Sequence, residues 1–349
     1  MNAVQVVAPG KLKMTSVASR ELLPWEVRIA MASTSICGSD MKNFRNPVLV
    51  PQIPGHEFSG VIVEVSKEAS ESFQLGNNVT VFPMLACLQC NDCKCGRYRD
   101  CVYKLSLGFQ LPGSFAEEVI VDSRFVIHLA EGLSFEQGAL IEHLCCGYRV
   151  AKEIVAHDIP KSAQIVLIGD GPIALADVQA LFLSGYRNMT LIGKYSMRMD
   201  IAVRFGVSRV YESSEITPTI GLHDIPSIDV CIMAAPAEQV LQQLLPVLKP
   251  GAFVFPQSRI HSQTILSFLE DRGIQMGRAF AYEMSDFSEV MELVKKGKID
   301  TESLVTSRID LLQLVEDFPS LLEKGMHLKT IIGNEKLHEI VENYRRKAI

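Results

Sequence analysis

Four cysteines stand together in one short segment with the spacing C-x2-C-x2-C-x7-C. They are Cys87, Cys90, Cys93 and Cys101. Four thiolates hold zinc in closed structural sites, and clustered cysteines in a chain of this size favour a metal over a disulfide framework. A site with four sulfur ligands leaves no position for a substrate. The pattern therefore predicts a structural zinc lobe over residues 84–104, and the chemistry must lie elsewhere.

Thiolate, imidazole and carboxylate side chains form a second, dispersed set. Cys37 lies in C-G-S-D, His56 and Glu57 lie in G-H-E-F-S-G, and Glu142 ends the run G-A-L-I-E. These three side-chain types are the ligands of an open catalytic zinc. Taken singly, Cys37 also fits a small buried residue, and His56 with Glu57 also fits a surface pair. The set indicates a metal centre only together with the cysteine lobe and a nucleotide signature.

A glycine-rich turn follows the apolar run that ends at Ile168. Its G-x-G-x-x-A sequence opens a helix. In a dinucleotide-binding turn the first glycine allows the tight bend, the second lets the backbone approach a pyrophosphate, and the small last residue lets the helix pack on the strand. The residues predicted to bind the cofactor here are Gly169, Gly171, Pro172, Ile173 and Ala174.

The next apolar run ends without the carboxylate that NAD-binding folds use for the ribose hydroxyls. Gly193 and Lys194 follow the run, and Arg198 lies one turn later. Each cation can form a charge-assisted hydrogen bond with a 2′-phosphate, worth about 1.5–3 kcal/mol. We therefore expect NADP(H) to be favoured over NAD(H). The alternative is that Lys194 and Arg198 are ordinary exposed cations at a helix start.

The length of 349 residues, with 48% hydrophobic and 21% charged residues, predicts a globular protein of two domains. Short strands dominate residues 1–150, and strand-like runs alternate with helical stretches over residues 151–283. This alternation predicts an α/β fold with a doubly wound parallel sheet.

The formal net charge of −6 excludes a polyanion as the main partner. No uncharged apolar run is long enough for a membrane helix, and no N-terminal segment has the pattern of a signal peptide. Nine cysteines, several outside both metal sets, fit a reducing compartment. We expect a cytoplasmic protein that acts on a small molecule, with neither nucleic acid nor a membrane as partner.

Together these motifs resemble the zinc-dependent medium-chain dehydrogenase/reductases of the alcohol dehydrogenase superfamily, in the polyol branch with sorbitol and galactitol-1-phosphate dehydrogenases. The resemblance covers essentially the whole chain. It implies a GroES-like β-rich catalytic domain over residues 1–150 and 284–349, a Rossmann domain over 151–283, two zinc ions per chain, and a homodimer or homotetramer.

Carried over residue by residue, the resemblance implies that Cys37, His56 and Glu142 hold the catalytic zinc, with Glu57 as a neighbouring or exchangeable ligand. Asp40 would orient His56, and Ser39 would relay the proton. The implied reaction is hydride transfer between NADP(H) and a secondary alcohol or ketone, most simply a polyol, ketose or sugar-alcohol phosphate.

Two other functions fit the same sequence. One is an NAD-linked zinc dehydrogenase of another secondary alcohol, such as a threonine-like side chain or a diol. The other is a nonenzymatic NADPH-binding sensor.

Several positions depart from the family pattern. His143 replaces a proline, and we expect it to pack, because adjacent residues on extended backbone point in opposite directions. Lys42 and Arg45 either bind an anionic group of the substrate or belong to a solvated loop. The sequence therefore does not identify the substrate.

Overall fold

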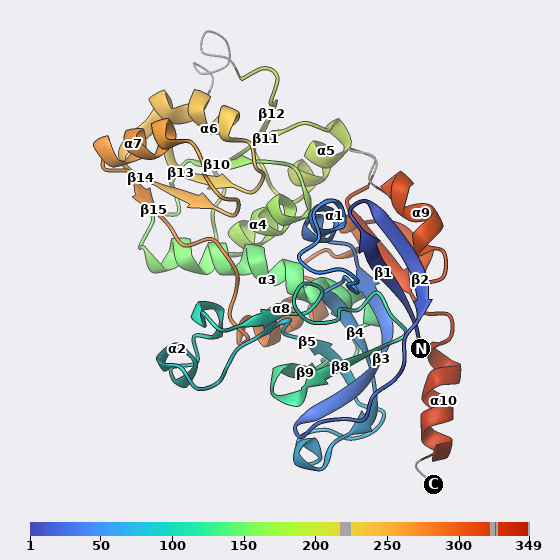
Figure 1. Cartoon of the computed structure of the whole chain (residues 1–349). Coiled ribbons are helices and arrows are strands. Elements are labelled where there is room, and N and C mark those ends of the chain that lie inside the picture. The colour runs from blue at the N-terminus through green and yellow to red at the C-terminus, as the bar shows by residue number, and fades with distance from the viewer. Residues whose placement is uncertain (217–224, 322–324, 326, 348–349) are drawn as a thin grey trace. The chain divides into compact units, whose positions relative to one another are not determined.

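The computed structural model describes residues 1–216, 225–321, 325 and 327–347, so small parts of the predicted ranges 151–283 and 284–349 lie outside the described residues. The chain divides into two compact units. Unit 1 contains Met1–Glu142 and Glu283–Ile349, and unit 2 contains His143–Tyr282. The helix α3 (Phe135–Ala156; Figure 1) contains the first boundary between the two units, which therefore falls inside a helix.

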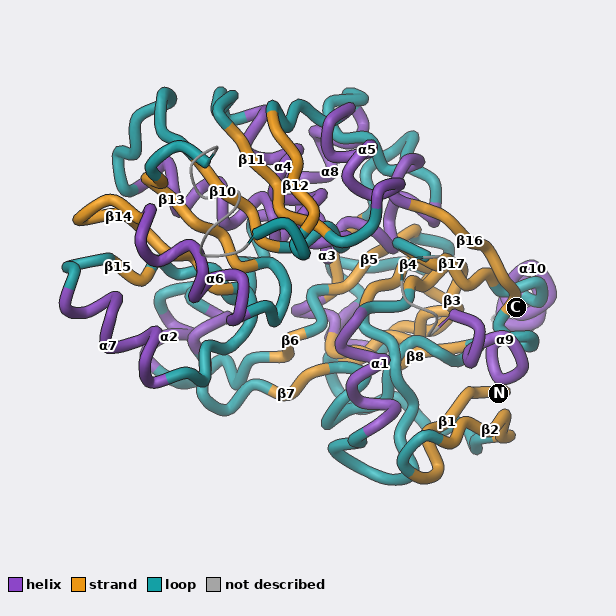
Figure 2. Tube along the Cα trace, turned by 90° about the horizontal axis from the view of Figure 1, so that it is seen from above, coloured by secondary structure: helices purple, strands orange, loops and turns teal. Residues whose placement is uncertain are grey.

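Unit 1 is built on a seven-stranded sheet in the order β16-β17-β3-β4-β5-β9, with β8 paired to β3. Its central strands are buried on both faces and are joined mainly in antiparallel pairs. The last strand, β17, lies against β3 (Figure 2), so the C-terminal part of the chain completes the sheet begun by the N-terminal part. The strands are β1 (Asn2–Ala8), β2 (Lys11–Ser16), β3 (Glu26–Ser35), β4 (Glu57–Val65), β5 (Asn78–Val81), β6 (Met84–Leu85), β7 (Leu105–Ser106), β8 (Glu118–Asp122), β9 (Val126–His128), β16 (Val305–Asp310) and β17 (Lys329–Gly333).

The helices of unit 1 lie between and after these strands. They are α1 (Gly38–Arg45), α2 (Asn91–Lys94), α8 (Asp286–Lys295), α9 (Leu314–Leu321) and α10 (Leu337–Lys347). Figure 2 shows β1 and β2 side by side as a separate hairpin, in agreement with their antiparallel pairing.

Unit 2 contains a six-stranded sheet in the order β12-β11-β10-β13-β14-β15, and every neighbouring pair is parallel. In order along the chain this is the 3-2-1-4-5-6 arrangement of a dinucleotide-binding fold. The elements are β10 (Ile165–Ile168), α4 (Pro172–Leu183), β11 (Met189–Gly193), α5 (Ser196–Arg204), β12 (Arg209–Glu212), β13 (Ile228–Met233), α6 (Glu238–Leu244), β14 (Leu248–Pro256), α7 (Gln263–Asp271) and β15 (Gln275–Met276). The predicted α/β class, with a parallel doubly wound sheet, is confirmed.

The helices of unit 2 pack on the sheet through apolar side chains. Leu241 and Leu244 of α6 and Leu269 of α7 belong to the same buried cluster as Ile168 and Val254 of the strands. Burial of a leucine-sized side chain contributes about 1.5–3 kcal/mol, so this cluster fixes the strand ends that carry the cofactor turn. Within the described residues, no helix is both long and apolar enough to cross a membrane.

Candidate functional site

The four cysteines of the lobe lie together as predicted. Their sulfur atoms lie within 4.8 Å of one another, and the Sγ atoms of Cys90 and Cys93 are 3.4 Å apart. The short helix α2 begins after Cys90, so the turn from Cys87 to Cys93 folds back on itself. The backbone N–H of Cys90 donates to Cys87 Sγ at 3.4 Å, and that of Cys87 donates to Cys101 Sγ at 3.3 Å.

These backbone donors favour thiolates. Hydrogen bonds from the backbone at Gln89 and Cys90 lower the pKa of Cys87 to about 6. Thiolate is the form that binds zinc. The donor set, its spacing and its hydrogen bonds therefore fit a closed four-sulfur zinc site, whereas Cys95 is exposed and outside the group.

Replacing Cys93 by serine is expected to remove about one zinc per chain and to loosen the lobe, because three thiolates no longer close the tetrahedron. Metal analysis together with limited proteolysis should show the lost zinc and new cleavage within residues 84–104. Cys95→Ser is the matched control and should keep the wild-type zinc content. Unchanged zinc in Cys93→Ser would contradict the assignment.

The second predicted centre is built at the start of α1. Cys37 is the N-cap residue of this helix, and the Asp40 carboxylate accepts its backbone N–H at 2.9 Å in a capping-box arrangement. The other Asp40 oxygen lies 3.4 Å from His56 Nδ1 and accepts the Gly55 N–H at 3.2 Å. One buried carboxylate thus fixes both the turn that carries Cys37 and the ring of His56.

The neighbours of Gly55, the residue before His56, leave no room for a side chain. Gly55 has φ +93°, and a Cβ there would lie 2.5 Å from Ser114 Oγ and 2.6 Å from the Phe115 ring. No other residue type fits this turn without displacing its neighbours. The close approach of the chain at Gly55 is what brings His56 toward Cys37.

His56 is almost fully buried, with 8% of its surface exposed. Burial lowers the pKa of its imidazole, but the charge and hydrogen bond of Asp40, with a smaller contribution from Cys37, outweigh burial and raise the pKa well above its usual value. A metal ion binding this imidazole must therefore displace a proton. Asp40 would orient the ring of such a ligand, as carboxylates next to metal-bound histidines do.

Glu57 completes a group of possible metal ligands with Cys37 and His56, whose ligand atoms lie within 4.8 Å of one another. Its carboxylate is already engaged. Lys329 Nζ lies 2.6 Å from Glu57 Oε1 and also contacts Oε2, and the Ser35 hydroxyl donates to the same carboxylate. Glu57 and Lys329 are 0% and 2% exposed.

Lys329 was not among the site residues predicted from the sequence. The register explains its place: Ser35 of β3 pairs with Glu57 of β4 and with Ile331 of β17, so the start of β17 lies at the metal group. Burial lowers the pKa of Lys329, but the charges of Glu57, Cys37 and Glu142 raise it overall, so the lysine stays protonated. A lone cation at the start of a buried strand was the signal available in the sequence.

The remaining candidates of this centre lie on helices. Glu142 is buried in α3 and is close enough to Lys329 to raise its pKa, although it is not in the group of Cys37, His56 and Glu57. His143 is fully buried, but it also lies in α3, so the expectation of extended backbone at this pair was wrong. Ser39 lies partly exposed in the first turn of α1, and Lys42 and Arg45 are exposed on the same helix and not in a loop.

The glycine-rich turn has the predicted geometry. Gly169 has φ +120°, and a Cβ there would lie 2.9 Å from Ala235 Cβ, so a side chain is excluded. Gly171 is the N-cap of α4, Pro172 is in its first turn, and Ala174 is fully buried. The first N–H groups of α4 therefore stand at the end of the central strand β10, where a pyrophosphate binds in this fold.

The end of β11 carries the predicted cations together with an unexpected anion. Lys194 is exposed and Arg198 lies in the first turn of α5, as expected from the sequence. Asp170, from the middle of the glycine-rich turn, accepts the backbone N–H groups of Lys194 and Tyr195, both at 2.7 Å. Its other oxygen lies 3.8 Å from Arg198 Nη1. A carboxylate is thus present at this strand end, although it is not at position 193.

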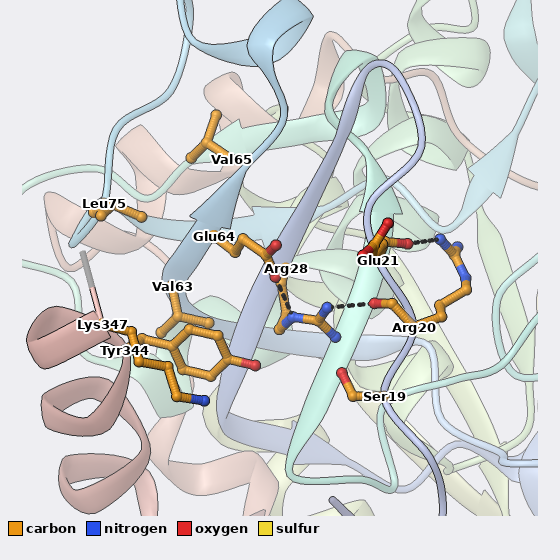
Figure 3. Close-up of a pocket in the computed structure, with 10 residues that line it drawn as sticks. All are labelled: Ser19, Arg20, Glu21, Arg28, Val63, Glu64, Val65, Leu75, Tyr344 and Lys347. Atoms are coloured by element: carbon orange, nitrogen blue, oxygen red, sulfur yellow. Dashed lines mark hydrogen bonds and ion pairs between the residues drawn. The ribbon is translucent and has the colours of Figure 1, made fainter.

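A pocket of about 570 Å³ in unit 1 lies elsewhere (Figure 3). It is bordered by β3, β4 and α10, and its buried cation, Arg28, donates to Glu64 at 2.7 Å and to the Arg20 carbonyl at 2.6 Å. None of its lining residues belongs to the metal groups or to the glycine-rich turn. It is therefore not the site of the predicted chemistry.

Comparison with known proteins agrees with this architecture. Residues 24–131 match the family model described as the alcohol dehydrogenase GroES-like domain. A probable D-xylulose reductase A from Aspergillus clavatus is 24% identical over 327 residues, which cover 89% of this chain and 90% of that protein.

Two solved structures share the fold. An alcohol dehydrogenase from Escherichia coli CFT073, complexed with NADH, has a TM-score of 0.84 and 23% identity, over 95% of this chain and 99% of that chain. A putative zinc-binding dehydrogenase from Sinorhizobium meliloti 1021, bound to NADP, has a TM-score of 0.81 and 22% identity, over 95% and 98%.

A GroES-like domain joined to a 3-2-1-4-5-6 parallel sheet defines an alcohol dehydrogenase-type oxidoreductase. These matches support the resemblance to zinc-type medium-chain dehydrogenase/reductases that the motifs led us to expect, and they indicate an alcohol/polyol dehydrogenase with zinc and a nicotinamide cofactor.

Proposed function

We propose that the protein transfers a hydride between NADP(H) and a secondary alcohol or ketone of a polyol, a ketose or a sugar-alcohol phosphate. The observation that carries this proposal is the buried group of Cys37, His56 and Glu57, organised by Asp40, in a chain that also has a dinucleotide turn. The similarity to a probable D-xylulose reductase supports a polyol or ketose as the substrate class.

We propose that Cys37, His56 and Glu142 hold the catalytic zinc. Glu57 is the competing carboxylate, but both of its oxygens already contact Lys329. A carboxylate whose charge is balanced by a buried ammonium is a weak metal ligand. The ion pair of Glu57 and Lys329 then lines the site with almost no net charge. The lobe cysteines hold a second, structural zinc.

Zinc bound at this site would supply Lewis-acid polarisation of the alcohol or carbonyl oxygen. The residues of the chain do the rest. Asp40 holds the His56 ring in place from Nδ1. We propose that the Ser39 hydroxyl, which can both donate and accept, passes the substrate proton outward.

We propose that Lys194 and Arg198 favour NADP(H) over NAD(H) by binding the 2′-phosphate. Support comes from the exposed Lys194, from Arg198 in the first turn of α5, and from the glycine at position 193. A fold neighbour bound to NADP supports this proposal.

The test is a parallel thermal-shift titration of the zinc-replete protein with NADPH and NADH, followed by a screen of ketose and ketose-phosphate reduction. A ligand that binds only the folded state stabilises it by about 2.7 kcal/mol at a hundred times its dissociation constant. We expect a larger shift with NADPH at equal concentration. A larger shift with NADH would redirect the assignment to NAD-linked polyol oxidation, and no shift with either would contradict the proposed cofactor.

We further propose a homodimer or homotetramer in the cytoplasm. None of the nine cysteines, all of which lie in described parts of the chain, is joined in a disulfide, which fits a reducing compartment. Light scattering of the purified protein measures the oligomeric state directly.

A further inference from the structure

Asp170 links the first two strands of the cofactor sheet. It is the variable residue between Gly169 and Gly171, and its side chain reaches across to the end of β11. One oxygen, Oδ2, accepts the backbone N–H groups of Lys194 and Tyr195 at 2.7 Å each. Only 7% of the residue is exposed, so these bonds hold the carboxylate in one place.

The position of Asp170 explains why residue 193 is glycine. A Cβ at Gly193 would lie 3.0 Å from Asp170 Cβ, 3.1 Å from Asp170 Oδ2 and 2.8 Å from Met199 Cγ. Gly193 lies in a β-strand and has no positive φ, so its backbone does not require glycine. The missing carboxylate at position 193 therefore has a steric cause, since the carboxylate of Asp170 already fills the space.

Arg198 lies near the same carboxylate, and both cations lie near the ring of Tyr195. Arg198 Nη1 lies 3.8 Å from Asp170 Oδ1, and the Arg198 guanidinium lies 4.7 Å from the Tyr195 ring centroid. Lys194 Nζ lies 5.8 Å from that centroid. Anion and cations thus share one small region at the strand end where dinucleotide folds bind the adenosine ribose.

We propose that Asp170 is a specificity-determining residue for the cofactor, which supplies from the glycine-rich turn the carboxylate that the end of β11 lacks. Its Oδ1 accepts a ribose hydroxyl of NAD(H). Toward NADP(H) the same charge repels the 2′-phosphate and competes with it for Arg198. This inference rests on the proposed function and refines it: Lys194 and Arg198 favour NADP(H), while Asp170 limits that preference to less than about tenfold.

The decisive variant is Asp170→Asn. The amide has the same shape, and its oxygen still accepts backbone N–H groups, so the turn is kept while the charge is removed. The probes are 2′,5′-ADP and 5′-ADP, which represent the adenosine halves of the two cofactors and need no hydride chemistry. Calorimetric titration of the full zinc-replete chain gives both dissociation constants.

We expect Asp170→Asn to tighten 2′,5′-ADP about tenfold and to weaken 5′-ADP several-fold. Asp200→Asn is the matched control, because Asp200 is an exposed acid on α5, the helix that carries Arg198. This variant also removes one negative charge, but at a place outside the glycine-rich turn. It should change the ratio of the two dissociation constants by less than about twofold.

A second variant keeps the test informative if the asparagine disturbs the turn. The pair Asp170→Gly with Gly193→Asp moves the carboxylate to the strand end, into the space that Asp170 leaves, and should shift the preference from 2′,5′-ADP toward 5′-ADP. An unchanged or lower preference for 2′,5′-ADP in Asp170→Asn would overturn the inference, since it would mean that Asp170 only positions Arg198 for the phosphate. Failure of the wild type to bind either probe would overturn the cofactor proposal as well.

Discussion

Replacing Lys329 by methionine is expected to lower the free energy of unfolding of unit 1 by about 3–5 kcal/mol, because it leaves the Glu57 carboxylate buried without its counter-charge. The pair is fully enclosed, with Lys329 2% and Glu57 0% exposed. Methionine keeps the length and apolar stem of lysine, so packing changes little. Urea unfolding, followed by a probe in unit 1, measures the change.

Two further variants separate the charge from the packing. Adding Glu57→Gln to Lys329→Met should recover most of the lost stability, since neither position of the pair then carries a buried charge. Lys336→Met is the matched control: its ion pair with Glu117 is 3.4 Å long and its side chain is 43% exposed, so its loss should cost less than about 1 kcal/mol. A loss in Lys329→Met no larger than that control would show that the pair does not support the fold.

Replacing Cys37 by serine is expected to lower kcat/KM by about a thousandfold or more and to remove about one zinc per chain. Loss of a ligand weakens the binding of zinc, and bound zinc stabilises the charge of the transition state by several kcal/mol. A thousandfold lower kcat/KM corresponds to a rise of about 4 kcal/mol in the activation free energy. Coupled turnover assays and metal analysis on the same preparation measure both effects.

The lobe provides the internal reference for this experiment. Cys37→Ser should retain the structural zinc, whereas Cys93→Ser should retain the catalytic one. Cys95→Ser, an exposed thiol outside both groups, should change neither activity nor zinc content. Full zinc content with unchanged turnover in Cys37→Ser would refute the catalytic metal assignment.

Buried elements were predictable from the sequence, and edge elements were not. The strands β10, β11, β13 and β14 appear as apolar runs because a parallel sheet buries both faces of its central strands. The strands β12 and β15 give no apolar run, because β12 has the pattern Arg-Val-Tyr-Glu and β15 has two residues, both exposed. At the edge of a sheet hydrogen bonding alone defines the strand, and composition gives no signal.

The candidate metal ligands and the glycine-rich turn could likewise be singled out from the sequence, since their residue types and spacing are local. Lys329 and Asp170 were not. Each acts on residues far away in the chain, Lys329 on Glu57 across 272 positions and Asp170 on the end of β11. Only strand register determines such partners, and a single sequence contains no direct record of register.

The strand β17 has a consequence for biosynthesis. Its pairing with β3 brings Lys329 to Glu57, so the ribosome makes the lysine that neutralises this carboxylate 272 positions after the carboxylate itself. Unit 2 ends at residue 282, before the strand β17 is synthesised. It can therefore fold on the ribosome while the sheet of unit 1 still lacks its last strand. The nascent chain therefore acquires its cofactor half first and closes the buried charge pair beside Cys37 and His56 last.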